Sequence, residues 1–329
     1  MLLKIISLCL ILFPVVNSPA QSSVFGGRGL FRTLSAQTLE PGSFLVHTVF
    51  ATYRIDDQER SKPVNILNLG LTYGWKDNLE LSTHLTPYQS IPSKGRIFAG
   101  HSSIAIKWQT PFSGSVAQTA LQAMVKLSLS KKNNLAHEPF SSNAVAWGAR
   151  ALFAVRLASS FPVKLNINIG YLDHEIDSFL KSETTDQLVF GAGLKIGTKS
   201  FIYYSEFSGE LFLNKPDLHF GNNSIRFTQG VKFRGPFKFL FDLGGDLGLS
   251  QPPDIVVNDV HRYAQWRIFA GLTYHVRPQR YFQKRTTSKN QLNEKAVDRL
   301  RNQRKNIDAK LDEILKELEA EPPKEKKEK

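Results

Sequence analysis

Apolar and polar residues alternate along much of this chain. In the segment 162–171 (PVKLNINIGY), Val163, Leu165, Ile167 and Ile169 are separated by lysine, asparagine and glycine residues. Because successive side chains of a strand point to opposite faces, the pattern predicts an extended segment with one apolar and one polar surface. A half-buried strand of a soluble sheet would show the same alternation, so one strand does not decide the class of protein.

The repetition of this pattern is more informative than any one copy of it. We expect twelve strands between Gly42 and Val276, over residues 43–55, 64–75, 79–87, 97–109, 119–130, 143–157, 162–172, 187–197, 200–212, 222–234, 237–250 and 264–276. Connections after even-numbered strands are compact, such as 198–199, whereas most others are longer, such as 173–186. Short turns on one rim and long loops on the other are typical of bacterial outer-membrane barrels. The sequence therefore predicts an all-β fold, an antiparallel transmembrane β-barrel of about twelve strands over residues 43–277.

The first twenty residues have the pattern of a signal peptide. Lys4 is followed by the apolar run 5–16 and by the small residues of Ser18-Pro19-Ala20, after which we expect cleavage. The single cysteine, Cys9, lies within this segment, so the mature chain would contain no disulfide. An even strand count would place both termini on the short-turn side, which is the periplasmic side of an outer-membrane barrel.

Residues 21–42 form a lead-in before the first strand. Its clustered glycines do not predict a phosphate-binding loop, because no strand precedes them and no Gly-Lys-Ser/Thr follows. We expect the lead-in to lie at the mouth of the barrel, with Arg28 and Arg32 facing carboxylates.

Aromatic residues support the barrel, because they gather near both ends of the expected strands. Amphipathic rings prefer the level of the lipid headgroups, which gives two belts. The short-turn ends carry Trp75, Trp108, Phe161, Phe201, Phe237 and Tyr274, and the opposite ends carry Tyr53, Tyr88, Phe98, Trp147, Tyr171 and Trp266.

The tail, residues 286–329, has a helical rather than a strand pattern. Apolar residues spaced three and four apart, with Arg304 as one polar interruption, predict an amphipathic α-helix before Pro322-Pro323 and a charged end. Docking on a periplasmic protein and self-association remain equally open, because the stripe is short for a coiled coil. Its members are Val297, Leu300, Ile307, Leu311, Ile314 and Leu318.

Three stretches resemble a known group of proteins. The lead-in GGRGLFRTLSAQTLEPGSF resembles the opening of predicted outer-membrane β-barrel proteins of Gram-negative bacteria, and residues 230–250 and 266–274 resemble their closing strands. Gly271, Tyr274 and Val276 are similar to the signal that the barrel assembly machinery reads, although valine replaces the usual terminal phenylalanine. The resemblance covers roughly residues 26–276 and implies a fold and a compartment, but no catalytic residues.

With the apolar faces turned outward, charged side chains would face the lumen. They would either form a charge-paired filling, which we favour, or a lining selective for anions. The expected basic residues are Lys107, Lys126, Arg150, Arg156, Lys164, Lys195, Arg226, Lys232, Arg234, Lys238 and Arg267, and the acidic ones are Glu80, Glu206, Glu210, Asp242 and Asp246.

Three histidines, His47, His84 and His101, would also face inward, near Ser82 and Ser103. A hydrolase needs a nucleophile, a base and an orienting group within hydrogen-bond reach, and no motif of this kind is present. No metal-ligand spacing accompanies the histidines either. We therefore expect polar lumen residues, no enzyme activity, no cofactor and no metal.

The formal net charge is +13, but the basic residues are dispersed rather than gathered with stacking aromatics, so nucleic acid is not an expected partner. Outer-membrane lipid and anionic lipopolysaccharide are expected instead. The first functional hypothesis is a narrow pore or transporter for small polar solutes, including anions. The alternatives are a scaffolding barrel whose C-terminal helix recruits a periplasmic partner, and a soluble secreted β-sandwich.

Overall fold

A computed structural model gives the structure of the protein. It describes residues 21–57, 60–91, 96–98, 100–128, 145–157, 162–174, 186–198, 200–214, 220–250 and 264–277, and helical positions between 297 and 310. Side chains of residues 54–57, 60–62, 91, 96–98, 128 and 238 are not described. Residues 1–277 and 278–329 form two separate units, and each is considered by itself.

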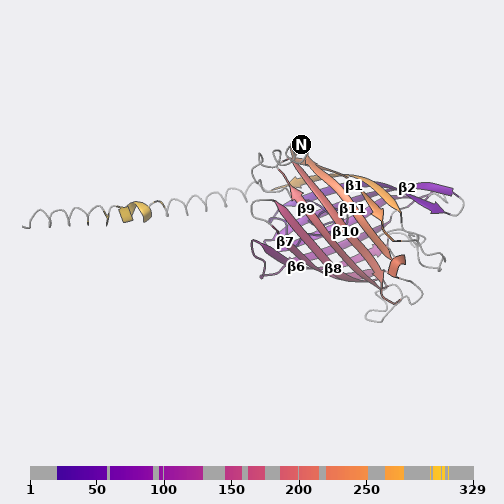
Figure 1. The fold of residues 1–329 in the computed structure, drawn as a ribbon, viewed down its shortest axis with the longest axis horizontal. Helices are drawn as coiled ribbons and strands as arrows, with labels where there is room; N and C mark the ends of the chain where they lie inside the picture. Colours follow the sequence, from indigo (N-terminus) through magenta and orange to yellow (C-terminus); the bar gives the residue numbers. More distant parts are fainter. Residues whose placement is uncertain are drawn as a thin grey trace, which may run out of the picture. The chain divides into compact units, whose positions relative to one another are not determined.

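The first unit is a cylinder of steeply tilted antiparallel strands (Figure 1). Each long strand pairs with its neighbours in the chain, because alternating sequences joined by short connections form hairpins most readily. The strands are β1 (Phe44–Asp57), β2 (Arg60–Lys76), β3 (Leu79–Ile91), β4 (Arg96–Phe98), β5 (His101–Gln109), β6 (Ala117–Ser128), β7 (Ala146–Arg156), β8 (Val163–Asp173), β9 (Gln187–Gly197), β10 (Phe201–Phe212), β11 (Ser224–Arg234), β12 (Phe239–Gly248) and β13 (Trp266–Val276).

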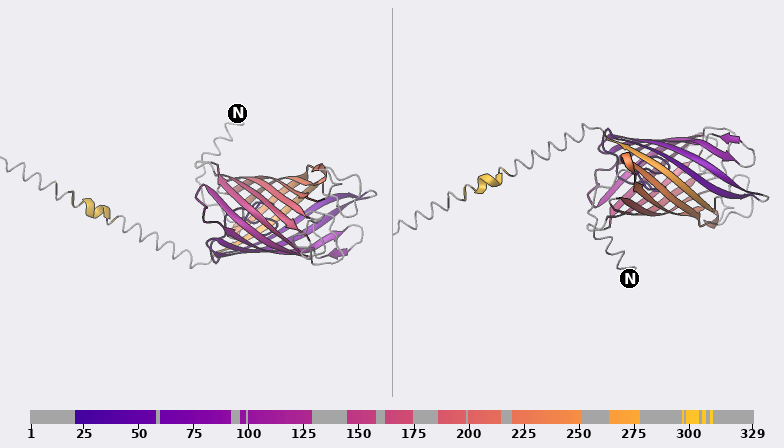
Figure 2. Two further views of the ribbon diagram at one scale, coloured as in Figure 1. Left: turned by 90° about the horizontal axis from the view of Figure 1, so that it is seen from below. Right: turned by 90° about the horizontal axis from the view of Figure 1, so that it is seen from above.

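The sheet closes on itself, as the two further views show (Figure 2). β1 pairs with β2 on one side and with β13 on the other, from Phe44 opposite Val276 to Tyr53 opposite Arg267. β4 has three residues and pairs with β3 alone, so the closed circuit contains the twelve other strands. The predicted twelve-stranded barrel is confirmed, and the soluble sandwich is wrong because a single sheet encloses the interior.

One predicted strand, 97–109, is interrupted in the structure. It is divided into β4 and β5, and between them the Gly100 amide donates to the Thr86 carbonyl oxygen at 2.7 Å. A side chain at Gly100 would lie within 2.9 Å of the Thr86 Cβ, so the close approach of the two backbones requires glycine there.

The outer face of the wall is apolar and the inner face is polar, as the alternation predicts. In β8, Ile167 and Ile169 are 41% and 48% exposed, while Asn166 and Asn168 are 3% and 7% exposed. An apolar surface that extends over so many strands would be unfavourable in water, and it matches the surface of a barrel that lipid covers.

The aromatic belts hold at most positions, with one exception. Trp75, Trp108 and Phe201 are exposed at strand ends on the short-turn side. Tyr53 is fully buried instead, because it lies on the inward face of β1, where the Arg267 guanidinium is 5.0 Å from its ring centroid. Phe161 lies outside the described residues, and the side chain of Phe98 is not described.

The lead-in enters the barrel rather than remaining at its mouth. None of the residues 21–42, which we call the plug, is exposed. Val24, Leu30, Phe31, Leu34 and Ala36 are each at most 6% exposed and pack against inward-facing residues of the wall. The interior of the barrel is therefore a core built from two parts of the chain.

The second unit contributes residues of one helix to the described structure. Residues 299–304 are helical, as predicted for the tail, and Val297, Leu300 and Ile307 are exposed. Leu311, Ile314 and Leu318 lie outside the described residues. Among the helical residues described, none belongs to a helix long and apolar enough to cross a bilayer.

The exterior yields a test based on depth in the bilayer. Ile167→Arg places a charge near mid-strand on the lipid face and should destabilise the refolded barrel by about 2–4 kcal/mol. Leu157→Arg places the same charge just beyond β7, where the cost should be about 0–1 kcal/mol. Urea unfolding in lipid vesicles measures both, and equal costs would contradict the assigned membrane span.

Candidate functional site: the plugged lumen

The plug has an irregular backbone that folds back on itself. The Val24 amide donates to the Phe31 carbonyl oxygen at 2.7 Å, and the Ser35 amide donates to that of Arg28 at 2.9 Å. The turn depends on Gly26 and Gly27, both with φ of +81°, a region that residues with a Cβ rarely adopt. The clustered glycines of the lead-in therefore serve a turn inside the lumen.

Carboxylate and amide side chains of the wall bind the plug backbone. Glu206 in β10 accepts hydrogen bonds from the amides of Phe31, Arg32 and Thr33 at 2.8–3.2 Å. Asn168 in β8 forms a reciprocal pair with Leu34, accepting from its amide at 2.6 Å and donating to its carbonyl oxygen at 2.9 Å. These contacts satisfy backbone groups that no secondary structure pairs.

Glu80 and Lys107 hold the second half of the plug as a joined pair. Glu80 accepts from the amides of Arg28 and Leu39 at 3.1 and 2.9 Å, and its Oε1 lies 2.7 Å from the Lys107 Nζ. The same ammonium donates to the carbonyl oxygens of Ser35 and Gln37 at 3.1 and 2.9 Å. The pair thus supplies acceptors and donors at neighbouring points of the backbone.

Lys232 has the corresponding role at the start of the plug. Its Nζ donates to the carbonyl oxygens of Ser22 and Leu30 at 3.0 and 3.2 Å, and lies 3.1 Å from the Asp242 carboxylate. Asp242 also accepts from the Tyr204 hydroxyl at 2.8 Å. The ammonium is nearly inaccessible to water, so its charge depends on these oxygen partners.

One carboxylate joins the plug to two strands through arginine. Arg32 of the plug and Arg226 of β11 donate to different oxygens of Asp246 in β12, at 2.8 Å from Arg32 Nη2 and 3.1 Å from Arg226 Nε. The sequence prediction that Arg32 faces a carboxylate is confirmed. Arg28 instead donates to the Thr38 carbonyl oxygen; burial lowers its pKa, and the nearby charges of Glu80 and Glu40 oppose that change.

Apolar contacts complete the seat of the plug. The Phe31 ring stacks on that of Phe269 in β13, with centroids 3.6 Å apart. On the opposite wall, a Cβ at Gly193 in β9 would lie 2.6 Å from the Leu30 Cδ1. The plug therefore lies directly on β9, where a larger inward side chain would displace it.

The three predicted lumen histidines are all buried. The Ser22 hydroxyl and His47 Nδ1 form a hydrogen bond, yet His47 Nε2 has no partner among the described residues, so no carboxylate orients the ring. His84 lies near His101, with centroids 5.2 Å apart, and bonds to Asn68. Within the described part of the chain, no three histidine, cysteine, aspartate or glutamate side chains meet as metal ligands.

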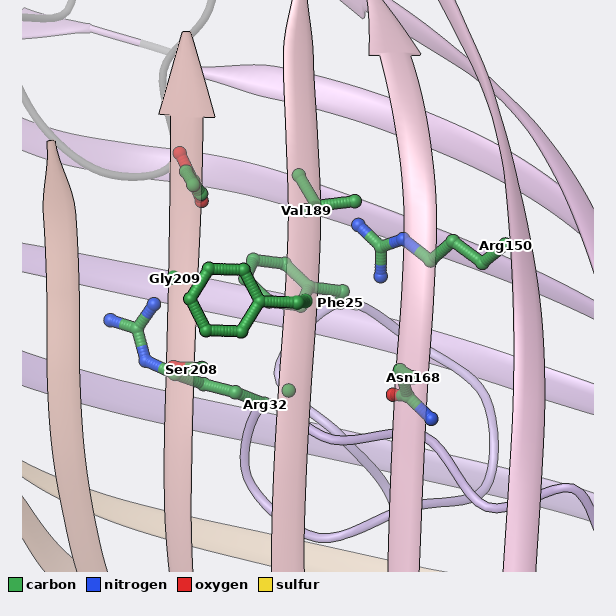
Figure 3. A pocket seen from close by; sticks show the side chains of 10 residues that line it. Phe25, Arg32, Arg150, Asn168, Val189, Ser208 and Gly209 are labelled. Atoms are coloured by element: carbon green, nitrogen blue, oxygen red, sulfur yellow. The ribbon is translucent and has the colours of Figure 1, made fainter. Parts of the chain in front are cut away.

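A cavity of about 40 Å³ remains between the plug and strands β7–β10 (Figure 3). Phe25 occupies its centre in the view, and the Arg150 guanidinium extends toward that ring, 5.9 Å from the centroid. Ser208 and Glu210 in β10 also line it. We call this small cavity between the plug and the wall the chamber.

Most of the residues expected in the lumen are enclosed there. Those buried or partly buried on the inward face are Lys107, Lys126, Arg150, Lys164, Lys195, Arg226, Lys232, Arg267, Glu80, Glu206, Glu210, Asp242 and Asp246. The prediction that Arg156 and Arg234 face the lumen is wrong, because these residues end β7 and β11 and are exposed at the rim. The side chain of Lys238 lies outside the described set.

The residues of the expected assembly signal lie in β13, at the seam with β1. Val276 pairs with Phe44 and Tyr274 with Val46, and both Val276 and Tyr274 are exposed on the outer face. A Cβ at Gly271 would lie 3.2 Å from the Asp242 Cβ, so a small residue suits the packing there. Recognition by the assembly machinery stays a prediction.

The extent of the plug is what the sequence analysis missed. A signal was present in β1 and β13, where inward positions such as Leu45, Val49, Ala51 and Phe269 are apolar although the lumen was expected to be polar. Apolar side chains facing a barrel interior require an apolar partner inside it, and the lead-in carries one in Leu30 and Phe31.

Comparison with protein-family models and with the sequences of curated proteins gives no match. Among solved structures, the chain is similar to the NanC porin, with 9% identity, a TM-score of 0.49, and coverage of 69% of this chain and 98% of that one. The KdgM porin is 8% identical, with a TM-score of 0.43 and coverage of 69% of this chain and 98% of that one. An outer membrane channel from Pseudomonas putida F1 is 12% identical, with a TM-score of 0.47 and coverage of 73% of this chain and 98% of that one.

The asparagine pair of β8 tests how the plug is held. In a chain carrying Ala36→Cys, at a position 0% exposed, a water-soluble maleimide should label slowly. Asn168→Ala removes both hydrogen bonds to Leu34 and should accelerate labelling by about tenfold or more. Asn166→Ala is the control, because this buried neighbour has no hydrogen bond to the plug. Equal acceleration by both changes would show that the Asn168 contacts do not hold the plug.

Proposed function

We propose that the chain is an outer-membrane β-barrel that forms a narrow passage for small polar solutes, including anions, and that the plug closes this passage at rest. The observation that carries the proposal is the way the plug is held. Wall side chains such as Glu206, Lys107 and Asn168 bind its backbone through hydrogen bonds, which water can replace when the plug moves.

The wall does not need the plug to remain closed. Twelve strands pair in a complete circuit through β1 and β13, so each strand of the circuit has two neighbours with or without a filled interior. A segment that fills a self-sufficient cylinder is suited to act as a gate, because its displacement leaves the wall intact.

The charge of the interior favours anions over cations. Basic side chains outnumber acidic ones on the enclosed inward face of the wall, and Arg28 and Arg32 of the plug add to the excess. Lys195 and Arg150 would remain in the lumen after the plug left it. A lining with excess positive charge raises the local concentration of anions.

In this proposal the protein lies in lipid and lipopolysaccharide of the outer membrane, with both termini in the periplasm. The short connections after β2, β9 and β11 support that orientation, because outer-membrane barrels place short turns on the periplasmic rim. The barrel assembly machinery would insert it through the Gly271, Tyr274 and Val276 signal.

Planar-bilayer conductance tests the gate. The full mature chain should give few or no current steps, whereas deletion of residues 22–39 should give sustained steps. Arg150→Glu with Lys195→Glu in the shortened chain should shift selectivity toward cations. Removal of residues 286–329 is the control and should leave conductance unchanged. A silent barrel without its plug would contradict the passage.

A scaffolding barrel is the second candidate, and two observations favour it. The lumen is filled, and the described helical residues of the tail expose Val297, Leu300 and Ile307, an apolar set that a periplasmic protein or a second copy could cover.

The tail has its own test. Leu300→Asp with Ile307→Asp removes apolar contacts without touching the barrel, and should abolish a crosslink between the tail and its partner in intact cells. Arg299→Gln with Arg301→Gln changes the net charge by the same two units at exposed positions outside the stripe. The scaffold fails if the apolar and polar variants crosslink equally well.

A further inference from the structure

We propose that the chamber beside the plug is a binding site for a small carboxylate anion, held by Arg150. The inference deepens the proposed passage function, on which it rests, by giving the solute a chemical class and a position in the lumen. The chamber lies between the wall strands β7–β10 and the plug residues Phe25 and Arg32 (Figure 3).

The size of the chamber suits a small polar group. Its volume of about 40 Å³ exceeds the roughly 10–15 Å³ that one water molecule requires. Part of its lining is apolar, with Phe25, Val189 and Phe190 beside the polar groups. A carboxylate with one methyl or methylene group matches both the volume and the mixture of surfaces.

Two polar groups at the chamber have no partner within the described residues. Ser208 is only 8% exposed, and its Oγ forms no hydrogen bond. The buried Nε of Arg150 forms no hydrogen bond either. An enclosed donor without an acceptor costs free energy, so such groups are ordinarily matched by water or by a ligand. A serine hydroxyl can donate or accept, but arginine can only donate, so the partner that Arg150 lacks is an acceptor.

The charges around the chamber indicate an anion. Arg150 and Lys126 lie within electrostatic range of each other and of a single carboxylate, Glu210, which leaves one positive charge in excess. The other arginine at the chamber, Arg32, is already paired with Asp246. The guanidinium of Arg150 is therefore the group available for a carboxylate, whose two oxygens match its planar donors.

Acetate binding to the full mature barrel in detergent, measured by saturation-transfer NMR, tests the site. Wild type should bind acetate and should not bind ethylammonium, a cation of similar size. Arg150→Gln should weaken acetate binding by about tenfold or more, and Arg150→Lys, which keeps the charge but loses the planar pair of donors, by several-fold. Arg156→Gln, on the same strand but exposed at the rim, should leave it unchanged.

Three results would overturn the proposal: no acetate binding to wild type, equal binding of ethylammonium, or equal loss in Arg150→Gln and Arg156→Gln. The faster gel migration of an unboiled folded barrel verifies each variant, and Arg150→Lys alone decides if Arg150→Gln does not fold. Because binding requires no flux, acetate bound to a barrel that never conducts would refute the passage and leave the site standing.

Discussion

The structure depends on one constraint, that an irregular backbone enclosed away from water must find hydrogen-bond partners. A helix in the lumen would pair its own amides and carbonyls, and a hairpin would pair those of its two strands, but the plug is neither over most of its length. The wall supplies the missing partners from side chains at positions fixed by the strand register. Glu206 alone receives three consecutive amides, which explains why a carboxylate lies in the interior with no basic partner directly opposite it.

This requirement changes the meaning of the lumen charges. A charge-paired filling would have acids and bases of adjacent strands facing one another, and Lys232 with Asp242 does so. Yet the same Lys232 also binds two carbonyl oxygens of the plug, and Lys107 does likewise beside Glu80. The interior is best understood as a polar binding surface for a peptide backbone, with the ion pairs orienting the side chains that contact it.

Much of this fold could be predicted from the sequence because the governing signal is local. Alternation within a strand and the length of each connection are properties of neighbouring residues, and they gave twelve strands and the inward set of β8 and β10. The errors have a common cause in position along a strand. Arg156 and Arg234 alternate onto the inward face, but they end their strands and are exposed at the rim. Tyr53 also lies on the inward face, although its aromatic ring suggested the lipid interface.

The plug could be predicted only in outline, since its contacts join residues far apart in the chain. The apolar inward residues of β1 and β13 indicate that an apolar segment lies inside the barrel. No pattern of neighbouring residues predicts that Phe31 contacts Phe269 or that Leu34 contacts Asn168. The chamber beside Arg150 was equally hidden. It exists because Phe25 approaches the wall without filling it, which is a matter of packing between distant segments.

The span of these contacts bears on how the molecule is made. Arg32 and Asp246 are 214 positions apart, and Phe31 and Glu206 are 175 apart. The plug therefore obtains part of its partners from strands that are synthesised late, although Glu80 in β3, Lys107 in β5 and Asn168 in β8 are available earlier. Contacts of such high sequence separation form slowly. Until β10 to β13 are in place, the plug lacks its contacts with Glu206, Asp246 and Phe269, and once β1 has joined β13 the plug can enter only through the ends of the cylinder. The order of two folding steps therefore matters, the pairing of β1 with β13 and the entry of the plug into the lumen. The last strands have to close around a segment that was synthesised before the first strand.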